Sequence, residues 1–259
     1  MLETAKLAAK EAGKVILKYF NQDVVFSEKE DKTVVSIADE ESEQVIIKTI
    51  KEKFPDHSIN GEETGRTGDS DIVWHVDPLD GTSNFKNKIP FSTVSIGVEK
   101  AGKFILGVIY NPFTDELFYA ELGNGAYLNE LKIQVTDLKL SKGAVVLDAS
   151  FRDDRAHRKL KTQEELLNHT SKFRMLGSNA LQLAELAKGQ YVCSISDAIH
   201  TYDFAAGLVI IREAGGVVTD QYGNEPTVDS VVIVATNNVD NHGKVIDITK
   251  RTYAGYKGM

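Results

Sequence analysis

The sequence has 259 residues, of which 42% are hydrophobic and 26% are charged, as in ordinary globular proteins with a large core. The net charge of −8 is opposite in sign to that of most proteins that bind duplex nucleic acid. The single cysteine, Cys193, disfavours a secreted disulfide-rich protein and a structural zinc site, and no apolar run approaches membrane-spanning length. We therefore expect a cytoplasmic protein that binds neither nucleic acid nor a membrane.

Two helices are expected at the start of the chain. Apolar residues recur at helical spacing over residues 2–20, and interspersed lysines favour an amphipathic helix over a signal peptide. A second helix is expected to begin near Ser36, with the acidic run 39–43 in its first turns, where negative charge suits the helix dipole. The polar segment 66–71 predicts a mobile loop.

Strand patterns follow these helices. Residues 72–76 predict a buried strand. An alternation of period two then predicts two hairpins, one formed by 91–99 with 103–110 and the other by 116–121 with 126–130. This antiparallel block argues against a Rossmann or TIM-barrel architecture, since both are built on parallel strands.

After about residue 140, helices and strands alternate. The expected strands are residues 144–147, 173–176, 191–195, 217–219 and 231–235. The expected helices are residues 155–170, 178–188 and 204–214, with a last helix that starts near 238–240. We accordingly divide the chain into two lobes, residues 1–138 and 139–259, which share one interface.

The segment from Trp74 to Phe85 is the most informative part of the sequence. Asp77 and Asp80 flank a proline directly after the expected buried strand, and carboxylates at a strand end suit hard metal ions. The following Gly81-Thr82 can open a helix whose free backbone N–H groups face an anion. An isolated Asp-Gly is usually a surface turn, but this context favours a site where a metal ion and a phosphate meet.

Four further acidic residues each allow a structural and a functional interpretation. Adjacent glutamates are usually solvated, but Glu62 is a candidate third metal ligand, and Glu63 either supports that ligand or is solvated. The spacing of Ser36 and Asp39 predicts a capping box, the alternative being that Asp39 orients or deprotonates a water. Asp203 suits an N-cap of the apolar helix that follows, or a metal ligand.

Taken together, these motifs resemble the inositol monophosphatase family. In chain order they are Gly61-Glu62-Glu63, Asp77-Pro78-Leu79-Asp80-Gly81-Thr82-Ser83-Asn84-Phe85, Asp203-Phe204-Ala205-Ala206-Gly207 and Glu213-Ala214-Gly215-Gly216. The resemblance spans nearly the whole chain. It implies an α+β fold with αβαβα layers, usually as a homodimer, and Mg²⁺-dependent hydrolysis of a phosphate monoester.

The resemblance also implies two or three Mg²⁺ ions in each site. In the family pattern, Glu62, Asp77 and the backbone carbonyl of Leu79 would hold one ion. Asp77, Asp80 and Asp203 would hold a second, and a weaker third would touch Glu62. Li⁺ is expected to inhibit, because family members commonly let it replace a loosely held Mg²⁺.

Catalytic and phosphate-binding roles follow from the same family pattern. Thr82, paired with Asp39, would activate the attacking water, and Glu62 completes the catalytic set. The backbone N–H groups of Gly81 and Thr82 would bind the phosphate. It is the resemblance, and not the residue spacing, that moves Asp39 from a helix cap to a catalytic residue.

The substrate side departs from the family pattern. We expect substrate contacts from Asp80, Ser83, Asn179, Ser196 and Asp203, with Ser150 as a further candidate. Ser196 stands seven residues before Asp203, where inositol-selective relatives carry a glutamate, so selectivity for inositol is open. Ser83 stands where the nucleotide phosphatases of the superfamily typically carry lysine, which argues against 3′-phosphoadenosine 5′-phosphate as the substrate.

The sequence therefore favours a phosphoric monoester hydrolase that acts on an inositol or sugar phosphate. Within the enzyme class, the alternatives are a fructose-1,6-bisphosphatase or dual-activity sugar phosphatase, and then a histidinol phosphatase. Outside it, the alternative is a regulatory binding protein that keeps the fold. Retention of Glu62, Asp77, Asp80, Thr82 and Asp203 argues against a purely non-catalytic protein.

Overall fold

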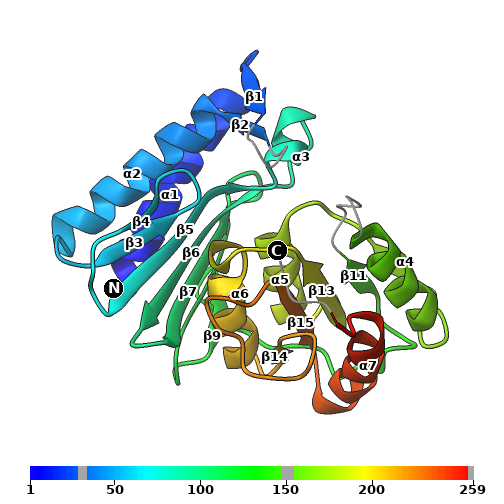
Figure 1. Ribbon diagram of the computed structural model, residues 1–259. Coiled ribbons are helices and arrows are strands. Elements are labelled where there is room, and N and C mark those ends of the chain that lie inside the picture. Colours follow the sequence, from blue (N-terminus) through cyan, green and yellow to red (C-terminus); the bar gives the residue numbers. More distant parts are fainter. Residues whose placement is uncertain (29–33, 148–154, 256–259) are drawn as a thin grey trace.

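The protein is built from alternating layers of helices and sheets (Figure 1). The computed structural model describes residues 1–28, 34–147 and 155–255, so Ser150 lies outside the described residues. The helices are α1 (Leu2–Phe20), α2 (Ile37–Lys53), α3 (Thr82–Lys86), α4 (Arg155–Leu166), α5 (Asn179–Ala187), α6 (Thr201–Glu213) and α7 (Val239–Thr252). In the described part of the chain, no helix is both long and apolar enough to cross a bilayer.

The larger sheet has eight strands in the order β10-β9-β8-β7-β6-β5-β3-β4. They are β3 (Ser58–Gly61), β4 (Gly65–Thr67), β5 (Ile72–Asp80), β6 (Thr93–Lys100), β7 (Lys103–Asn111), β8 (Glu116–Glu121), β9 (Ala126–Leu128) and β10 (Leu131–Ile133). All neighbours are antiparallel except β3 and β5. Both predicted hairpins are present, as β6–β7 and β8–β9.

The smaller sheet has five strands in the order β12-β11-β13-β15-β14. They are β11 (Val145–Leu147), β12 (Phe173–Arg174), β13 (Cys193–Asp197), β14 (Val217–Thr219) and β15 (Val232–Thr236). The sheet is mixed, because β11 is parallel to both its neighbours and β15 antiparallel to both of its own. A separate two-stranded ribbon pairs β1 (Phe26–Glu28) with β2 (Val34–Ser36), and the sequence had not indicated it.

Three apolar clusters join the layers into the expected αβαβα order. The first lies between α1, α2 and the larger sheet, the second surrounds α5 and α6 between the two sheets, and the third lies between the smaller sheet, α4 and α7. Cys193 belongs to the third cluster, and burial raises the pKa of its thiol, as expected for an inert core cysteine.

Helix α6 packs directly against the larger sheet because the residues at the contact are small. A Cβ atom at Gly97 would lie 2.5 Å from that of Ala205, and one at Gly107 would lie 2.2 Å from the carbonyl oxygen of Ala206. Most of α6 is buried, as expected for a helix that is apolar around its circumference. The second half of the chain thus packs on a sheet from the first, and the lobe boundary at residues 138/139 stays a prediction.

The structure differs from the sequence-based expectations at several element ends. Strand β5 runs on to Asp80, α4 ends at Leu166 and not at residue 170, and β13 spans Cys193–Asp197 and not residues 191–195. Residues 65–67 form β4 and pair with β3, so part of the segment expected to be a mobile loop is an edge strand. Helix α6 begins at Thr201, three residues before the expected start, because the polar residues ahead of its apolar run already form its first turn.

Candidate active site

Asp77 and Asp80 lie on β5, three positions apart, yet their carboxylates converge. Successive side chains of a regular strand point to opposite faces, so residues at this spacing should diverge. The pairing with β6 aligns Asp77 with Ser95 and Asp80 with Thr93, which leaves one extra residue in β5. This bulge, which contains Pro78, turns both carboxylates to the same side of the sheet.

Gly81 makes the turn from β5 into α3. Its φ of 91° lies in the left-handed region that glycine adopts without strain. A Cβ atom here would also lie 3.1 Å from the carbonyl oxygen of Phe91 and 3.2 Å from that of Gly177. The turn places Thr82 first in α3, where a backbone N–H has no partner within the helix.

The side chain of Thr82 reaches back to α2. Its Oγ1 lies 3.2 Å from Oδ1 of Asp39 and 3.1 Å from the carbonyl oxygen of Leu79. Oδ2 of Asp39 accepts hydrogen bonds from the backbone N–H and the hydroxyl of Ser36, both at 2.8 Å, which forms the predicted capping box. Burial raises the pKa of Asp39 to about 6, although the hydrogen bonds from Ser36 act in the opposite direction.

Asp203 comes from the first turn of α6. It is not the N-cap, because the helix begins earlier than expected and the N-cap is His200. The Oδ2 atom of Asp203 accepts a hydrogen bond of 2.6 Å from the backbone N–H of His200, so the side chain still supports the helix start. The hydroxyl of Ser95 donates to the carbonyl of Tyr202 at 3.2 Å, which ties this turn to β6.

Asp80 is held by the N-terminus of α5. Its carboxylate accepts hydrogen bonds from the Ser178 hydroxyl, from the backbone N–H of Asn179 at 3.0 Å and from that of Ala180 at 2.8 Å. The positive end of a helix stabilises such a charge. This contact was missed from the sequence, although the expected helix start at Ser178 was the signal that could have found it.

Glu62 lies in the turn between β3 and β4, and Glu43 fixes that turn. The Glu43 carboxylate is buried and accepts hydrogen bonds from the backbone N–H groups of Glu63, at 2.9 Å, and Thr64, at 2.8 Å. A Cβ atom at Gly61 would lie 2.7 Å from this carboxylate. The role of Glu43 was missed because it lies in an acidic run that indicated only a charged helix start.

These elements surround a pocket with a volume of about 220 Å³. It is lined by Glu62, Asp77, Leu79, Asp80, Gly81, Thr82, Ser83, Gly177, Asn179 and Asp203. Carboxylate oxygens of Asp77, Asp80 and Asp203 lie within 4.8 Å of one another. Among the described residues that line the pocket, four are acidic and none is basic.

The electrostatics of this pocket favour the binding of a cation. Burial, together with the charges of Glu62, Asp80 and Asp203, holds the pKa of Asp77 well above its usual range. Burial also raises the pKa of Asp80 to about 6, against the hydrogen bonds from α5. Buried carboxylates this close repel one another unless a cation or protons neutralise them. Oxygen ligands alone fit a hard ion such as Mg²⁺.

Comparison with known proteins agrees with this site. A family model described as the inositol monophosphatase family matches residues 1–252. The chain belongs to the inositol monophosphatase family. Among curated relatives, the Nus factor SuhB of Xylella fastidiosa is 40% identical over 221 residues, which cover 83% of this chain and 80% of that protein.

Solved structures from the inositol monophosphatase family show the same fold. The extragenic suppressor protein suhB of Bartonella henselae has a TM-score of 0.90 at 32% identity and covers 98% of both chains. The inositol monophosphatase of Anabaena has a TM-score of 0.83 at 35% identity, over 97% of this chain and 94% of that one. A protein described as an inositol monophosphatase–fructose 1,6 bisphosphatase has a TM-score of 0.82 at 28% identity, over 95% and 98%.

Nearly all site residues expected from the inositol monophosphatase pattern come together. The predicted metal ligands Glu62, Asp77, Leu79, Asp80 and Asp203 all line the pocket. The predicted substrate residues Ser83 and Asn179 line it as well, and Asn179 also contributes its backbone N–H to Asp80. Asp39 joins the site through Thr82.

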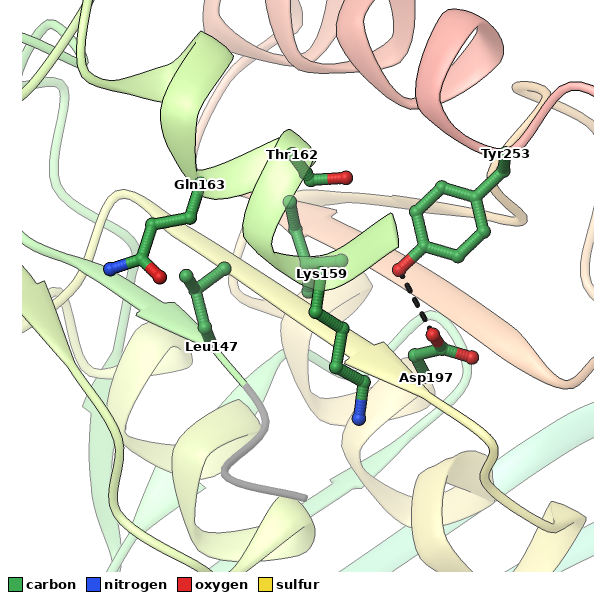
Figure 2. Close-up of a pocket in the computed structure, with 7 residues that line it drawn as sticks. Leu147, Lys159, Thr162, Gln163, Asp197 and Tyr253 are labelled. Carbon is green, nitrogen blue, oxygen red and sulfur yellow. Dashed lines mark hydrogen bonds between the residues drawn. The ribbon is translucent and has the colours of Figure 1, made fainter. Parts of the chain in front are cut away.

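Ser196 is the exception among the expected substrate residues. It is 1% exposed within β13, and it is not among the described residues that line the pocket. Asp197, the next residue, accepts a hydrogen bond of 3.2 Å from the Tyr253 hydroxyl in a small separate pocket, to which α4 contributes Lys159 (Figure 2). A substrate contact by Ser196 therefore stays a prediction.

Proposed function

We propose that the protein hydrolyses a phosphate monoester of inositol or a sugar in a Mg²⁺-dependent reaction. The observation that carries this proposal is a pocket in which carboxylates converge beside the first backbone N–H groups of α3, with no basic side chain among its described lining residues. Such a pocket repels a phosphate dianion until cations bind. Membership of the inositol monophosphatase family supports the same chemistry.

The acidic residues divide between the proposed ions. Glu62, Asp77 and the carbonyl of Leu79 would hold one Mg²⁺, and Asp77, Asp80 and Asp203 a second, with a weaker third beside Glu62. Bound Mg²⁺ supplies charge neutralisation of the phosphate and lowers the pKa of a coordinated water. The hydrogen bonds from α5 to Asp80 fix the orientation of that carboxylate before any ion arrives.

Thr82 and Asp39 would prepare the attacking water. The Thr82 hydroxyl donates to Asp39 and keeps its lone pairs for a water in the pocket, so the water's proton can pass to Thr82 as the Thr82 proton passes to Asp39. A pKa of about 6 lets Asp39 accept that proton near neutral pH. The backbone N–H groups of Gly81 and Thr82 would bind the phosphate oxygens. The water oxygen would bond to phosphorus as the bond from phosphorus to the ester oxygen breaks, and the leaving alkoxide would take a proton from solvent, so no phosphoenzyme is expected.

A substrate panel tests this proposal. Phosphate release is measured with and without Mg²⁺ on inositol 1-phosphate, fructose 1,6-bisphosphate and histidinol phosphate, and kcat/KM is compared. We expect Mg²⁺-dependent turnover of inositol 1-phosphate. The similarity to a protein described as an inositol monophosphatase–fructose 1,6 bisphosphatase favours fructose 1,6-bisphosphate as a second substrate. No release from any of the three would contradict the proposal.

A regulatory role is the second candidate, because curated relatives at 36–40% identity are named Nus factors. Complementation separates the two functions. An Asp80→Asn variant that lacks phosphatase activity is introduced into a strain in which the gene is deleted. Failure to rescue supports the enzyme, whereas rescue by the inactive variant would show that contacts, and not turnover, are the essential function.

Two further properties belong to the same proposal. We expect a homodimer, which sedimentation equilibrium measures directly. We also expect Li⁺ to inhibit phosphate release and its inhibition to weaken at higher Mg²⁺ concentration, because the two ions would compete for the loosely held site. Inhibition that does not depend on Mg²⁺ would contradict that competition.

A further inference from the structure

A second pocket, with a volume of about 260 Å³, lies at the end of α6 that is remote from Asp203. It is lined by Gly102, Lys103, Phe104, Leu122, Leu208, Val209, Arg212, Glu213 and Glu225. Asp203 is in the first turn of α6, whereas Arg212 and Glu213 are its last two residues. The two pockets thus lie at opposite ends of one buried helix, and the proposed hydrolysis uses only one of them.

The floor of this second pocket is apolar. Phe104, Leu208 and Val209 are 7%, 1% and 2% exposed, and Leu122 stands at the rim with 44% of its surface exposed. A concave surface with an apolar floor and charged groups around it can take up a small molecule that has both an apolar and a polar part. The aromatic ring of Phe104 in this floor favours a flat ligand that can stack on it or meet it edge to face.

Three of the four charged residues around the second pocket already have partners. Arg212 binds the Glu225 carboxylate through two hydrogen bonds of 2.6 and 2.9 Å. The Glu213 carboxylate accepts hydrogen bonds from the backbone N–H groups of Gly123, at 2.8 Å, and Gly125, at 2.7 Å. These bonds hold the turn after Leu122 in place. Lys103 forms no ion pair within the described part of the chain. Lys103 is thus the cation of this pocket that is not already paired with a carboxylate, and it can bind one acidic group of a ligand.

Phe104 connects the floor of the second pocket to both elements that carry the acidic cluster. Its ring centroid lies 5.7 Å from that of Phe204 in an edge contact and 5.9 Å from the ring of His75. Phe204 directly follows Asp203 on α6, and His75 precedes Asp77 by two positions on β5. Because protein interiors are close-packed, a ligand that shifts the Phe104 ring displaces these neighbours as well.

We propose that the second pocket binds a small molecule with a flat apolar body and one acidic group, and that its occupation changes the Mg²⁺ affinity of the acidic cluster. The first part stands on the pocket alone. The second part rests on the proposed function, because it requires the cluster to be a Mg²⁺ site.

The first part is tested by fluorescence titration with 8-anilinonaphthalene-1-sulfonate, a flat apolar probe with one anionic group. Leu122→Glu and Lys103→Glu place negative charge at the pocket. Leu167→Glu is the control, because it replaces another exposed leucine by glutamate outside the pocket. We expect 1:1 binding to wild type and to the Leu167 variant, and at least about tenfold weaker binding to the two pocket variants. Circular dichroism melts confirm that all four proteins fold. Equal affinity in all four would overturn the pocket assignment.

The second part is tested by calorimetric titration of Mg²⁺ with and without saturating probe. Couplings between sites typically change affinity about 5- to 150-fold, so we expect a shift of at least about fivefold in wild type and none in Leu122→Glu. Probe binding without a shift would overturn the coupling but not the pocket. Absence of Mg²⁺ binding in both titrations would refute the proposed function and the coupling together, and the probe titration alone would then decide whether the pocket binds a ligand.

Discussion

The hydroxyl of Thr82 lies 3.2 Å from the carboxylate of Asp39, although the two residues are 43 positions apart in the chain. The other oxygen of Asp39 caps α2 through Ser36. One buried carboxylate therefore serves both the helix start and the pocket, and the fold fixes its position before a substrate binds. Preorganisation of this kind is what efficient catalysis requires.

Asp39→Asn should separate these two roles. The amide cannot accept the proton that Thr82 would pass on, so kcat for inositol 1-phosphate should fall by about 10²-fold or more, in the range usual for loss of a general base. The control Ser36→Ala removes the hydroxyl that caps α2 and one of the two hydrogen bonds to Oδ2 of Asp39, but it keeps the bond from the backbone N–H and leaves the Asp39 carboxylate beside Thr82. It should lower the free energy of unfolding by about 1 kcal/mol and reduce kcat far less than Asp39→Asn. Equal losses of kcat in the two variants would instead assign Asp39 to the cap alone.

Glu43→Gln should weaken Mg²⁺ binding although Glu43 does not line the pocket. An amide has one acceptor oxygen, so one of the two N–H bonds to the Glu63–Thr64 turn is lost and Glu62 is less well positioned. We expect at least about tenfold weaker affinity, as is typical for residues that orient metal ligands. The matched control Glu40→Gln, at an exposed position on the same helix, should leave the Mg²⁺ affinity measured by calorimetry unaltered. A similar loss of affinity in the control would show that the effect comes from net charge alone.

Two glycine-to-alanine changes should have opposite effects on stability. At Gly107 the new methyl group meets the Ala206 carbonyl oxygen, so overpacking should lower the free energy of unfolding by about 2–3 kcal/mol. At Gly243, within α7, nothing lies within 4 Å of the added Cβ, and the change to alanine should raise the free energy of unfolding by about 0.5–1 kcal/mol. Urea denaturation measures both, and a neutral Gly107 variant would disprove the close packing of α6.

Stability should fall in mild acid because of His242. Its ring lies between the hydroxyls of Thr219 and Thr236, each at 3.0 Å, and burial lowers its pKa to about 4. The unfolded chain binds a proton near pH 6.5 and the folded protein only near pH 4, so stability is lost as pH falls between these values, by about 3 kcal/mol at most.

Replacement by glutamine checks this assignment. The slope of unfolding free energy against pH between pH 6.5 and 4 should be shallower in His242→Gln than in wild type. His157→Gln provides the control, since that side chain is exposed in the fold. If the two variants gave the same slope as wild type, other groups would account for the acid sensitivity.

The sequence predicted the features that depend on local pattern. The strand before Asp77, the helix that starts after Gly81 and the capping box at Ser36 each follow from a few neighbouring residues. The apolar periodicity of α1 and the hairpins also depend on short windows. The αβαβα order depends on which faces of the helices and sheets pack together, and short windows do not show this. That order was therefore expected from the family resemblance alone.

Features that depend on tertiary contacts were not predictable. The bulge at Pro78 that aligns the two aspartates arises from pairing with β6, and the bonds from α5 to Asp80 span about a hundred positions. Glu43 stands at the end of an acidic run typical of an exposed helix start, and nothing near it in the sequence shows that its partners are the N–H groups of residues 63 and 64. Helix α6 begins three residues before its expected start, because the polar residues of its first turn show no apolar periodicity in the sequence.

The most direct test of the central claim is phosphate release from inositol 1-phosphate as Mg²⁺ is titrated into metal-free protein, for wild type and Asp77→Asn. We predict no release without Mg²⁺, saturable release with it, and almost none from the variant at any Mg²⁺ concentration, with its cooperative unfolding retained. Release from wild type in excess chelator, or near-normal release from the variant, would contradict the assignment of this pocket as a metal-dependent phosphatase site.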